Sequence, residues 1–195
     1  MSHQAIIKTI IINNTKISLK ATETHLKGCF ILEPDVFKDD RGYFFESYNE
    51  SKLKQILGYN PVFVQDNQSK STFGVIRGLH MQAGDFSQAK LVRVLEGAVL
   101  DVVVDARKDS ATFGKSFSIE LTADSNKQLF VPRGFLHGFS VLSEEAVFFY
   151  KCDNLYNKES ESGVNPLDRS LGIDWKIAKE KMILSEKDRE AQIGR

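Results

Sequence analysis

Short runs of β-forming residues, separated by glycine, aspartate, asparagine or proline, follow one another from residue 30 to residue 150. This pattern predicts strands over residues 43–48, 62–67, 75–79, 90–96, 98–105, 117–121, 128–131, 139–142 and 146–150. Many short strands at near-regular spacing are typical of an all-β barrel or sandwich and not of a βαβ sheet. The hydrophobic pattern therefore indicates an all-β fold.

The clearest pair of strands lies at the centre of the chain, where residues 91–95 and 99–104 flank the hairpin-like break at residues 96–98. The second run is apolar on both faces, as expected for a strand inside a two-sheet sandwich. Helical patterning is confined to residues 51–57 and to part of the tail between residues 178 and 191. We therefore expect only a few short peripheral helices.

The length of 195 residues suits one domain with a substantial core. Because no internal repeat, linker or low-complexity segment divides the sequence, we expect residues 25–195 to form a single domain with a capping segment at its C-terminal end. The isoleucine-rich stretch 6–12 is too short to span a membrane and lacks a clear small-residue cleavage site. Residues 1–24 are interpreted as an N-terminal extension or an extra strand.

Composition narrows the classes of partner and compartment. Lysine plus arginine equals aspartate plus glutamate at 26 each, so no bulk charge attracts nucleic acid or an anionic membrane. An anionic ligand must then be held by a local cluster of cations. Cys29 and Cys152 are too few for a disulfide framework, which makes the cytoplasm the expected compartment.

The histidines bear on whether the site holds a metal. His3 and His25 lie in the N-terminal arm, which leaves His80 and His137. A metal-binding β-barrel usually supplies a His-x-His pair from one strand, a nearby carboxylate and a later histidine. Gln82 stands where the second histidine of such a pair would be. We therefore expect no tightly held metal and no other cofactor.

Three cations have positions that suit a diphosphate. Arg77 precedes His80 by three residues, Lys90 begins the next predicted strand, and Arg41 lies in a predicted turn. Guanidinium groups bind phosphate oxygens in pairs, so the three cations together would form an anion site. Surface salt bridges with Asp39, Asp40 and other carboxylates are an equally good interpretation.

Four further polar residues have both a structural and a chemical interpretation. Gln65 and Asn67 share one strand face, where amides can bind a base edge or a sugar hydroxyl, or only satisfy backbone groups. Tyr150 ends an apolar strand on an inward position and is either a core tyrosine or a proton donor. Asp188 is either a helix N-cap or a solvated charge, or the carboxylate that orients a histidine base.

Taken together, six stretches of the chain resemble one family, the dTDP-4-dehydrorhamnose 3,5-epimerases of deoxysugar biosynthesis. The similarity runs from about residue 28 to residue 188 and is carried by FKDDRGYFFE (37–46), VQDNQS (64–69), RGLHMQ (77–82), QAKLVR (88–93), VPRGFLHGF (131–139) and LSEKD (184–188). Each stretch is weak evidence by itself, but their common order is specific. The resemblance implies a cupin jelly roll that works as a homodimer.

The resemblance also implies roles for individual residues. His80 would be the general base, paired with Asp188; Tyr150 would be the general acid on the opposite face of the sugar, and Lys90 would stabilise an enolate. The positions that correspond to nucleotide or diphosphate contacts, some of them reaching across a dimer interface, are Arg41, Glu46, Gln65, Asp66, Asn67, Arg77, His137, Glu161 and Lys187.

The implied activity is epimerisation of dTDP-4-dehydro-6-deoxy-D-glucose at C3 and C5, giving dTDP-4-dehydro-L-rhamnose by metal-free proton transfer. Two alternatives are a dTDP-4-keto-sugar epimerase that inverts one centre and a non-catalytic sugar-nucleotide-binding cupin. A non-catalytic relative would be expected to lose His80, Asp188 or Tyr150, and all three are present. A second aromatic residue often precedes the family position of Tyr156 and helps to enclose the thymine, whereas this chain has Leu155.

Overall fold

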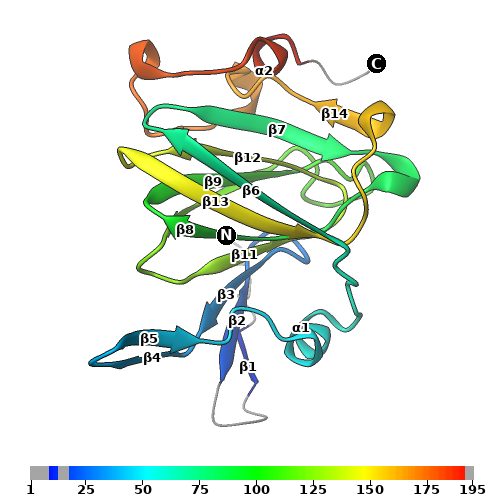
Figure 1. The fold of residues 1–195 in the computed structure, drawn as a ribbon. Helices are drawn as coiled ribbons and strands as arrows, with labels where there is room; N and C mark the ends of the chain where they lie inside the picture. The colour runs from blue at the N-terminus through cyan, green and yellow to red at the C-terminus, as the bar shows by residue number, and fades with distance from the viewer. Residues whose placement is uncertain (1–8, 13–17, 192–195) are drawn as a thin grey trace, which may run out of the picture.

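The computed structural model of the protein describes residues 9–12 and 18–191, and most of its elements are strands (Figure 1). The larger sheet has seven strands in the order β1 (Thr9–Ile12), β2 (Leu19–Glu23), β3 (Phe30–Pro34), β11 (Gln128–Val131), β8 (Lys90–Glu96), β13 (Glu145–Cys152) and β6 (Gln65–Thr72). The smaller sheet has five strands in the order β10 (Ser116–Thr122), β9 (Ala98–Asp105), β12 (Phe135–Val141), β7 (Ile76–Gln82) and β14 (Glu161–Gly163).

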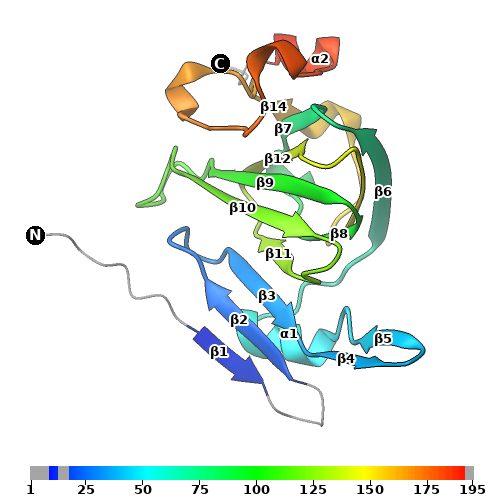
Figure 2. The same cartoon turned by 90° about the vertical axis from the view of Figure 1, so that its left-hand side faces the viewer.

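The remaining elements are short and peripheral. β4 (Val36–Asp39) and β5 (Gly42–Phe45) form a separate hairpin that projects away from the two main sheets (Figures 1 and 2). The helices are α1 (Glu50–Leu57) and α2 (Glu186–Glu190), with 3-10 turns at Gly84–Phe86, Lys158–Ser160, Arg169–Leu171 and Lys179–Lys181. The predicted all-β jelly roll with a few short helices is confirmed, as an open sandwich of two sheets. Within the described part of the chain, no helix is long and apolar enough to cross a membrane.

The predicted strands agree best with the structure where the sequence is apolar. β8, β9 and β11 have the predicted bounds, whereas β12 begins four residues earlier than expected and β6 runs on to Thr72. β2, β3, β4 and β14 were not predicted, and the tail holds only the single turn of α2 and short 3-10 turns. β1 and β2 extend the larger sheet beside β3, but residues 1–8 and 13–17 of the predicted extension lie outside the described residues. The division of the chain at residue 24 stays a prediction.

Alternating side chains of β9 explain why this strand is apolar on both faces. Val99 and Val103 point into the core between the two sheets, together with buried residues of β8, β11, β12 and β13. Leu100, Val102 and Val104 point to the opposite face of the smaller sheet, where C-terminal residues such as Trp175 cover them. The second apolar face is thus buried by the C-terminal segment and not by another sheet.

A third cluster covers the outer face of the larger sheet. Leu53 and Ile56 of α1 pack there against Phe30, Leu91 and Phe130. α1 begins at Asn49, whose side chain accepts a hydrogen bond from the Lys52 amide, and ends at Gly58 in a left-handed conformation. This helix therefore covers part of the outer face of the larger sheet.

Candidate active site

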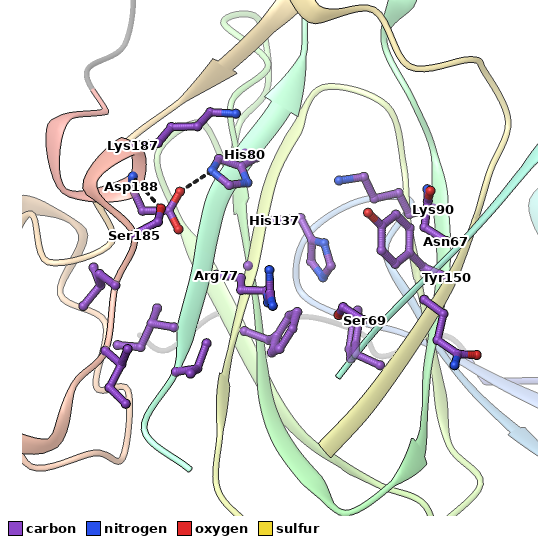
Figure 3. Close-up of a pocket in the computed structure, with 18 residues that line it drawn as sticks. Asn67, Ser69, Arg77, His80, Lys90, His137, Tyr150, Ser185, Lys187 and Asp188 are labelled. Atoms are coloured by element: carbon purple, nitrogen blue, oxygen red, sulfur yellow. Dashed lines mark hydrogen bonds and ion pairs between the residues drawn. The ribbon is translucent and has the colours of Figure 1, made fainter. Parts of the chain in front are cut away.

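The period of two along each strand brings the polar candidates together on the inner faces of the sheets. Tyr150 follows the core residue Phe148 by two positions on β13, and Lys90 precedes the core residue Val92 by two positions on β8. Beyond this end of the core lies a cavity of about 640 Å³. Its lining includes Asn67, Ser69, Arg77, His80, Lys90, His137, Tyr150, Ser185, Lys187 and Asp188 (Figure 3).

His80 and Asp188 form a close pair on one wall of the cavity. His80 Nε2 lies 2.6 Å from Asp188 Oδ1, and Asp188 is only 4% exposed. Asp188 is held by the first turn of α2, where its amide donates to Ser185 Oγ. Burial pushes the pKa of Asp188 upward, but hydrogen bonding and charge from His80 outweigh it and hold the pKa below its ordinary value. The pair predicted from residues 108 positions apart is thus brought together by the C-terminal segment.

Gly78 permits the close approach of β7 and β12 beside this pair. Its φ is +109°, and a Cβ atom built on it would lie 2.6 Å from the carbonyl oxygen of His137. The register between the two strands shifts between His137 and Phe139. The sequence predicted that a glycine before His80 would allow a tight or bulged backbone. Gly78 does lie beside an irregularity in the smaller sheet, and the two strands at this irregularity carry His80 and His137.

Tyr150 and Lys90 lie on the opposite wall, across the cavity from His80 (Figure 3). Lys90 Nζ is 5.6 Å from the centroid of the Tyr150 ring. Desolvation lowers the pKa of Lys90, and burial raises the pKa of Tyr150 above its ordinary value. At neutral pH the phenol is therefore protonated and able to donate a proton.

A second histidine–aspartate pair lies between the two walls. His137 Nε2 is 3.0 Å and 3.1 Å from the two carboxylate oxygens of Asp101, and both side chains are buried. Sequence reasoning did not identify Asp101. The available signal was an aspartate at an inward position of β9, within a run that is otherwise apolar.

Of the three cations predicted to hold a diphosphate, Arg77 and Lys90 line the cavity and Arg41 does not. Lys187, predicted as a contact residue, lines it as well. Arg77 is exposed and donates through Nε to Ser71 Oγ at 3.0 Å. Lys187 Nζ lies 2.6 Å from Glu161 Oε1. His80, Lys187 and Glu161 also line a neighbouring hollow of about 830 Å³. His80 therefore stands between the cavity and this hollow.

Four predicted contact residues lie outside both spaces. Arg41 is at the turn of the β4–β5 hairpin and bonds Asp39, whereas Glu46 accepts a hydrogen bond from Lys52 Nζ at 2.8 Å. Asp66 projects from the outer face of β6 and forms an ion pair with Lys151 at 2.8 Å. Gln65 shares a face with Asn67, as expected, and donates to its side-chain oxygen at 3.1 Å. Their roles toward a ligand stay predictions.

The chemistry of the site is that of proton transfer in a partly enclosed space. A histidine with an ionised partner stands on one wall, a protonated tyrosine on the other, and a lysine side chain lies near each. Among residues 9–12 and 18–191, no three histidine, cysteine, aspartate or glutamate side chains are grouped so that they could hold a metal ion.

Comparison with known proteins gives a consistent result. The sequence profile of the dTDP-4-dehydrorhamnose 3,5-epimerase family matches residues 23–193. The chain is 49% identical over 170 residues to the dTDP-4-dehydrorhamnose 3,5-epimerase of Escherichia coli (strain K12), covering 87% of this chain and 91% of the relative. The crystal structure of the enzyme of that name from Elizabethkingia anophelis NUHP1 matches with a TM-score of 0.87 at 59% identity, covering 90% of this chain and 96% of the other.

A second solved structure contains a ligand. It is the dTDP-6-deoxy-D-glucose-3,5-epimerase of Legionella pneumophila Philadelphia 1 in complex with dTDP-4-keto-L-rhamnose. It matches with a TM-score of 0.86 at 42% identity, covering 90% of this chain and 92% of the other. The similarity thus extends over nearly the whole described chain.

Proposed function

The chain belongs to the dTDP-4-dehydrorhamnose 3,5-epimerase family, and from that premise we propose how its own residues carry out the reaction. The protein is an isomerase that epimerises dTDP-4-dehydro-6-deoxy-D-glucose at C3 and C5 to dTDP-4-dehydro-L-rhamnose. One observation carries the assignment of roles: the His80–Asp188 pair and the Tyr150–Lys90 pair face each other across one cavity. A sugar ring between them has a base on one face and an acid on the other.

His80 removes the proton from the carbon next to the ketone. Because Nε2 faces the ionised Asp188, this nitrogen carries the hydrogen and Nδ1 is left with the lone pair that accepts the proton. Asp188 fixes this tautomer and stabilises the imidazolium that forms. General base catalysis of this kind contributes roughly 10²–10⁴-fold to a rate.

The enolate that results places negative charge on the C4 oxygen, and Lys90 is the donor assigned to it. One preorganised donor at such an oxygen contributes about 3–4 kcal/mol. The lowered pKa of Lys90 does not remove this role, because the side chain has N–H groups in either protonation state. His137, held by Asp101 in the wall between the two pairs, contacts the substrate as a second polar group.

Tyr150 returns a proton on the opposite face of the ring, which inverts the centre. Burial raises the pKa of its phenol, so the group enters the reaction protonated. Once His80 has released its proton to solvent and Tyr150 has regained one, the same two steps at the second carbon next to the ketone give double epimerisation without a metal or another cofactor. An enzyme that inverts one centre would use the same residues, and the position of solvent deuterium in the product distinguishes the two.

The rest of the substrate is held by the cations and amides at the rim. Arg77 and Lys187 bind the diphosphate, and Asn67 and Glu161 line the approach to it. Gln65 supports Asn67 through the hydrogen bond between their side chains. We propose that Arg41, Glu46 and Asp66 complete the nucleotide site across a homodimer interface. The projecting β4–β5 hairpin supports this, because its Tyr43 and Phe44 are exposed in the single chain.

The compartment proposed for this reaction is the cytoplasm. Cys29 and Cys152 are both free and buried in the structure, and neither forms a disulfide. Free thiols persist in a reducing environment.

The decisive experiment follows deuterium from solvent into dTDP-4-keto-6-deoxyglucose with His80→Asn and Tyr150→Phe enzymes. His80→Asn should abolish exchange while dTDP affinity stays close to that of the wild type, since Arg77 and Lys187 are intact. Tyr150→Phe should exchange a proton at His80 yet fail to invert the centre. Exchange by His80→Asn, or wild-type epimerisation by Tyr150→Phe, would overturn the assigned roles.

A further inference from the structure

The segment between β13 and the 3-10 turn at Lys158–Ser160 borders the site without joining a sheet. We call residues 153–157 the rim segment. Leu155 and Tyr156 on this segment are 59% and 55% exposed. Tyr156 lines the hollow that contains His80 and Lys187. Its ring therefore offers a partly exposed aromatic face to this hollow.

Side-chain amides from three places in the fold hold the backbone of the rim segment. Gln88 Nε2 donates to the carbonyl oxygen of Asn154 at 2.8 Å, and Gln65 Oε1 accepts from the Tyr156 amide at 2.9 Å. Gln82 makes the largest number of these contacts. Its Nε2 donates to Leu155 O at 3.1 Å, and its Oε1 accepts from the Asn157 amide at 2.6 Å.

Gln82 bonds the backbone on both sides of Tyr156, and it also donates to Phe86 O at 2.7 Å. It is 5% exposed, so these bonds are shielded from water. The pattern requires two donors and one acceptor on one side chain. An amide satisfies it, whereas an ionised carboxylate has no donor, and a thioether has no donor and only a weak acceptor.

We propose that Gln82 is a positioning residue for nucleotide recognition: it fixes the rim segment so that the ring of Tyr156 meets the nucleobase. The proposal rests on the proposed function, because it takes the substrate to be a nucleoside diphosphate sugar. Gln82 follows the general base His80 by two residues on β7. The same strand therefore holds the residue that abstracts the proton and the residue that positions the ring for the nucleobase.

The far end of the Tyr156 side chain is held separately. Its hydroxyl donates to Glu161 Oε2 at 2.9 Å, and the other oxygen of Glu161 pairs with Lys187. Glu161 therefore holds the phenol, while Gln82 holds the backbone from which the ring extends. Loss of Gln82 would move the ring relative to the cavity without touching the His80–Asp188 pair.

The test compares the affinities of dTDP and inorganic pyrophosphate for wild-type enzyme, Gln82→Glu and Gln82→Met by titration calorimetry. Both variants should weaken dTDP binding about tenfold or more, because the ring of Tyr156 is no longer fixed against the nucleobase. This loss is of the size found for the stacking of a base on an aromatic side chain. Pyrophosphate affinity should stay within about twofold, because Arg77 and Lys187 are unchanged. The turnover number at saturating substrate should stay within about threefold, with the loss in KM.

Gln88→Met provides a milder variant if Gln82 variants fold poorly, and it should weaken dTDP in the same direction by about threefold. Ser140→Ala is the control, since it removes another buried side-chain bond, to Trp175 O at 2.8 Å, away from the rim segment. Equal weakening of dTDP and pyrophosphate, unchanged dTDP affinity, or a turnover number that falls at constant KM would overturn the proposal. Failure of the proposed function would instead show as wild-type enzyme that incorporates no deuterium into the keto sugar.

Discussion

Replacement of Asp188 by asparagine tests whether the close pair on the cavity wall drives proton abstraction. The substitution keeps the size of the side chain and removes its charge. Asp188 lies 2.6 Å from His80 Nε2, is 4% exposed and has a pKa held below its ordinary value. The wild-type enzyme therefore presents an ionised carboxylate to the imidazole throughout the neutral range.

The size of the effect follows from the kind of hydrogen bond that is lost. A bond to a charged partner contributes about 1.5–3 kcal/mol and a neutral one about 0.5–1.5 kcal/mol. The difference of roughly 1–2 kcal/mol corresponds to about a 5- to 30-fold slower step, at 1.36 kcal/mol per factor of ten. If the amide nitrogen turns toward Nε2, the other tautomer is favoured and Nδ1 no longer accepts a proton, so the loss is larger.

The assay is the rate of deuterium incorporation from solvent at C3 and C5, followed by proton NMR. We expect Asp188→Asn to slow both positions in parallel and to leave dTDP affinity within about twofold. Glu186→Gln is the matched control, because it removes an exposed carboxylate from the same turn of α2. Wild-type exchange by Asp188→Asn, or an equal loss in Glu186→Gln, would refute the pairing as the source of basicity.

Three further predictions concern the frame of the site and its chemistry. Gly78→Ala should lower the free energy of unfolding by about 2 kcal/mol more than Gly58→Ala in urea denaturation, because both positions have positive φ but only the first Cβ would meet backbone atoms. Asp105 is buried, which raises its pKa, but bonds from Arg107, Ser110 and Thr112 outweigh this and lower it. The ionised Asp105 therefore stabilises the folded protein fully above the pKa of about 3.9 that aspartate has in the unfolded chain. This stabilisation is lost as the pH falls through the lower pKa of the folded protein. Asp105→Asn should cost about 2–3 kcal/mol at neutral pH, and its difference from the wild type in urea should narrow below about pH 4. Finally, dialysis against a chelator should leave the rate of deuterium exchange unchanged; a loss that one divalent metal restores would require a metal in the mechanism.

The apolar strands and the main chemical pairs could be predicted because their signals are local. β8 is mostly hydrophobic, β9 is a nearly continuous hydrophobic run, and Gly97 separates them. The bounds of both strands were therefore predicted correctly. The resemblance carried by six short motifs paired His80 with Asp188, and the structure brings the two together. Without that resemblance, the contact between β7 and α2 could not be predicted from the hydrophobic pattern, because it depends on how the C-terminal segment packs on the smaller sheet.

β6 shows why other strands were missed or displaced. Its sequence from Gln65 to Thr72 is polar throughout, because one face lies in solvent at the edge of the sheet and the other lines the polar cavity. A strand that buries little apolar surface on either face has no hydrophobic alternation to detect. The same polar character that provides Asn67 and Ser69 to the site therefore conceals the strand in the sequence.

Asp101 and Gln82 illustrate a second limit, which concerns partners and not elements. Asp101 stands out in an apolar run, but the sequence alone does not specify that His137 of β12 lies opposite it. In the sequence, Gln82 indicated only that the second histidine of a metal-binding His-x-His pair is missing. In the structure its amide instead bonds two carbonyl oxygens and one backbone N–H of separate loops. A position that a metal-binding β-barrel would use to hold an ion here bonds the backbone around an exposed aromatic ring. The identity of this one residue therefore bears both on metal binding and on the placement of the ring.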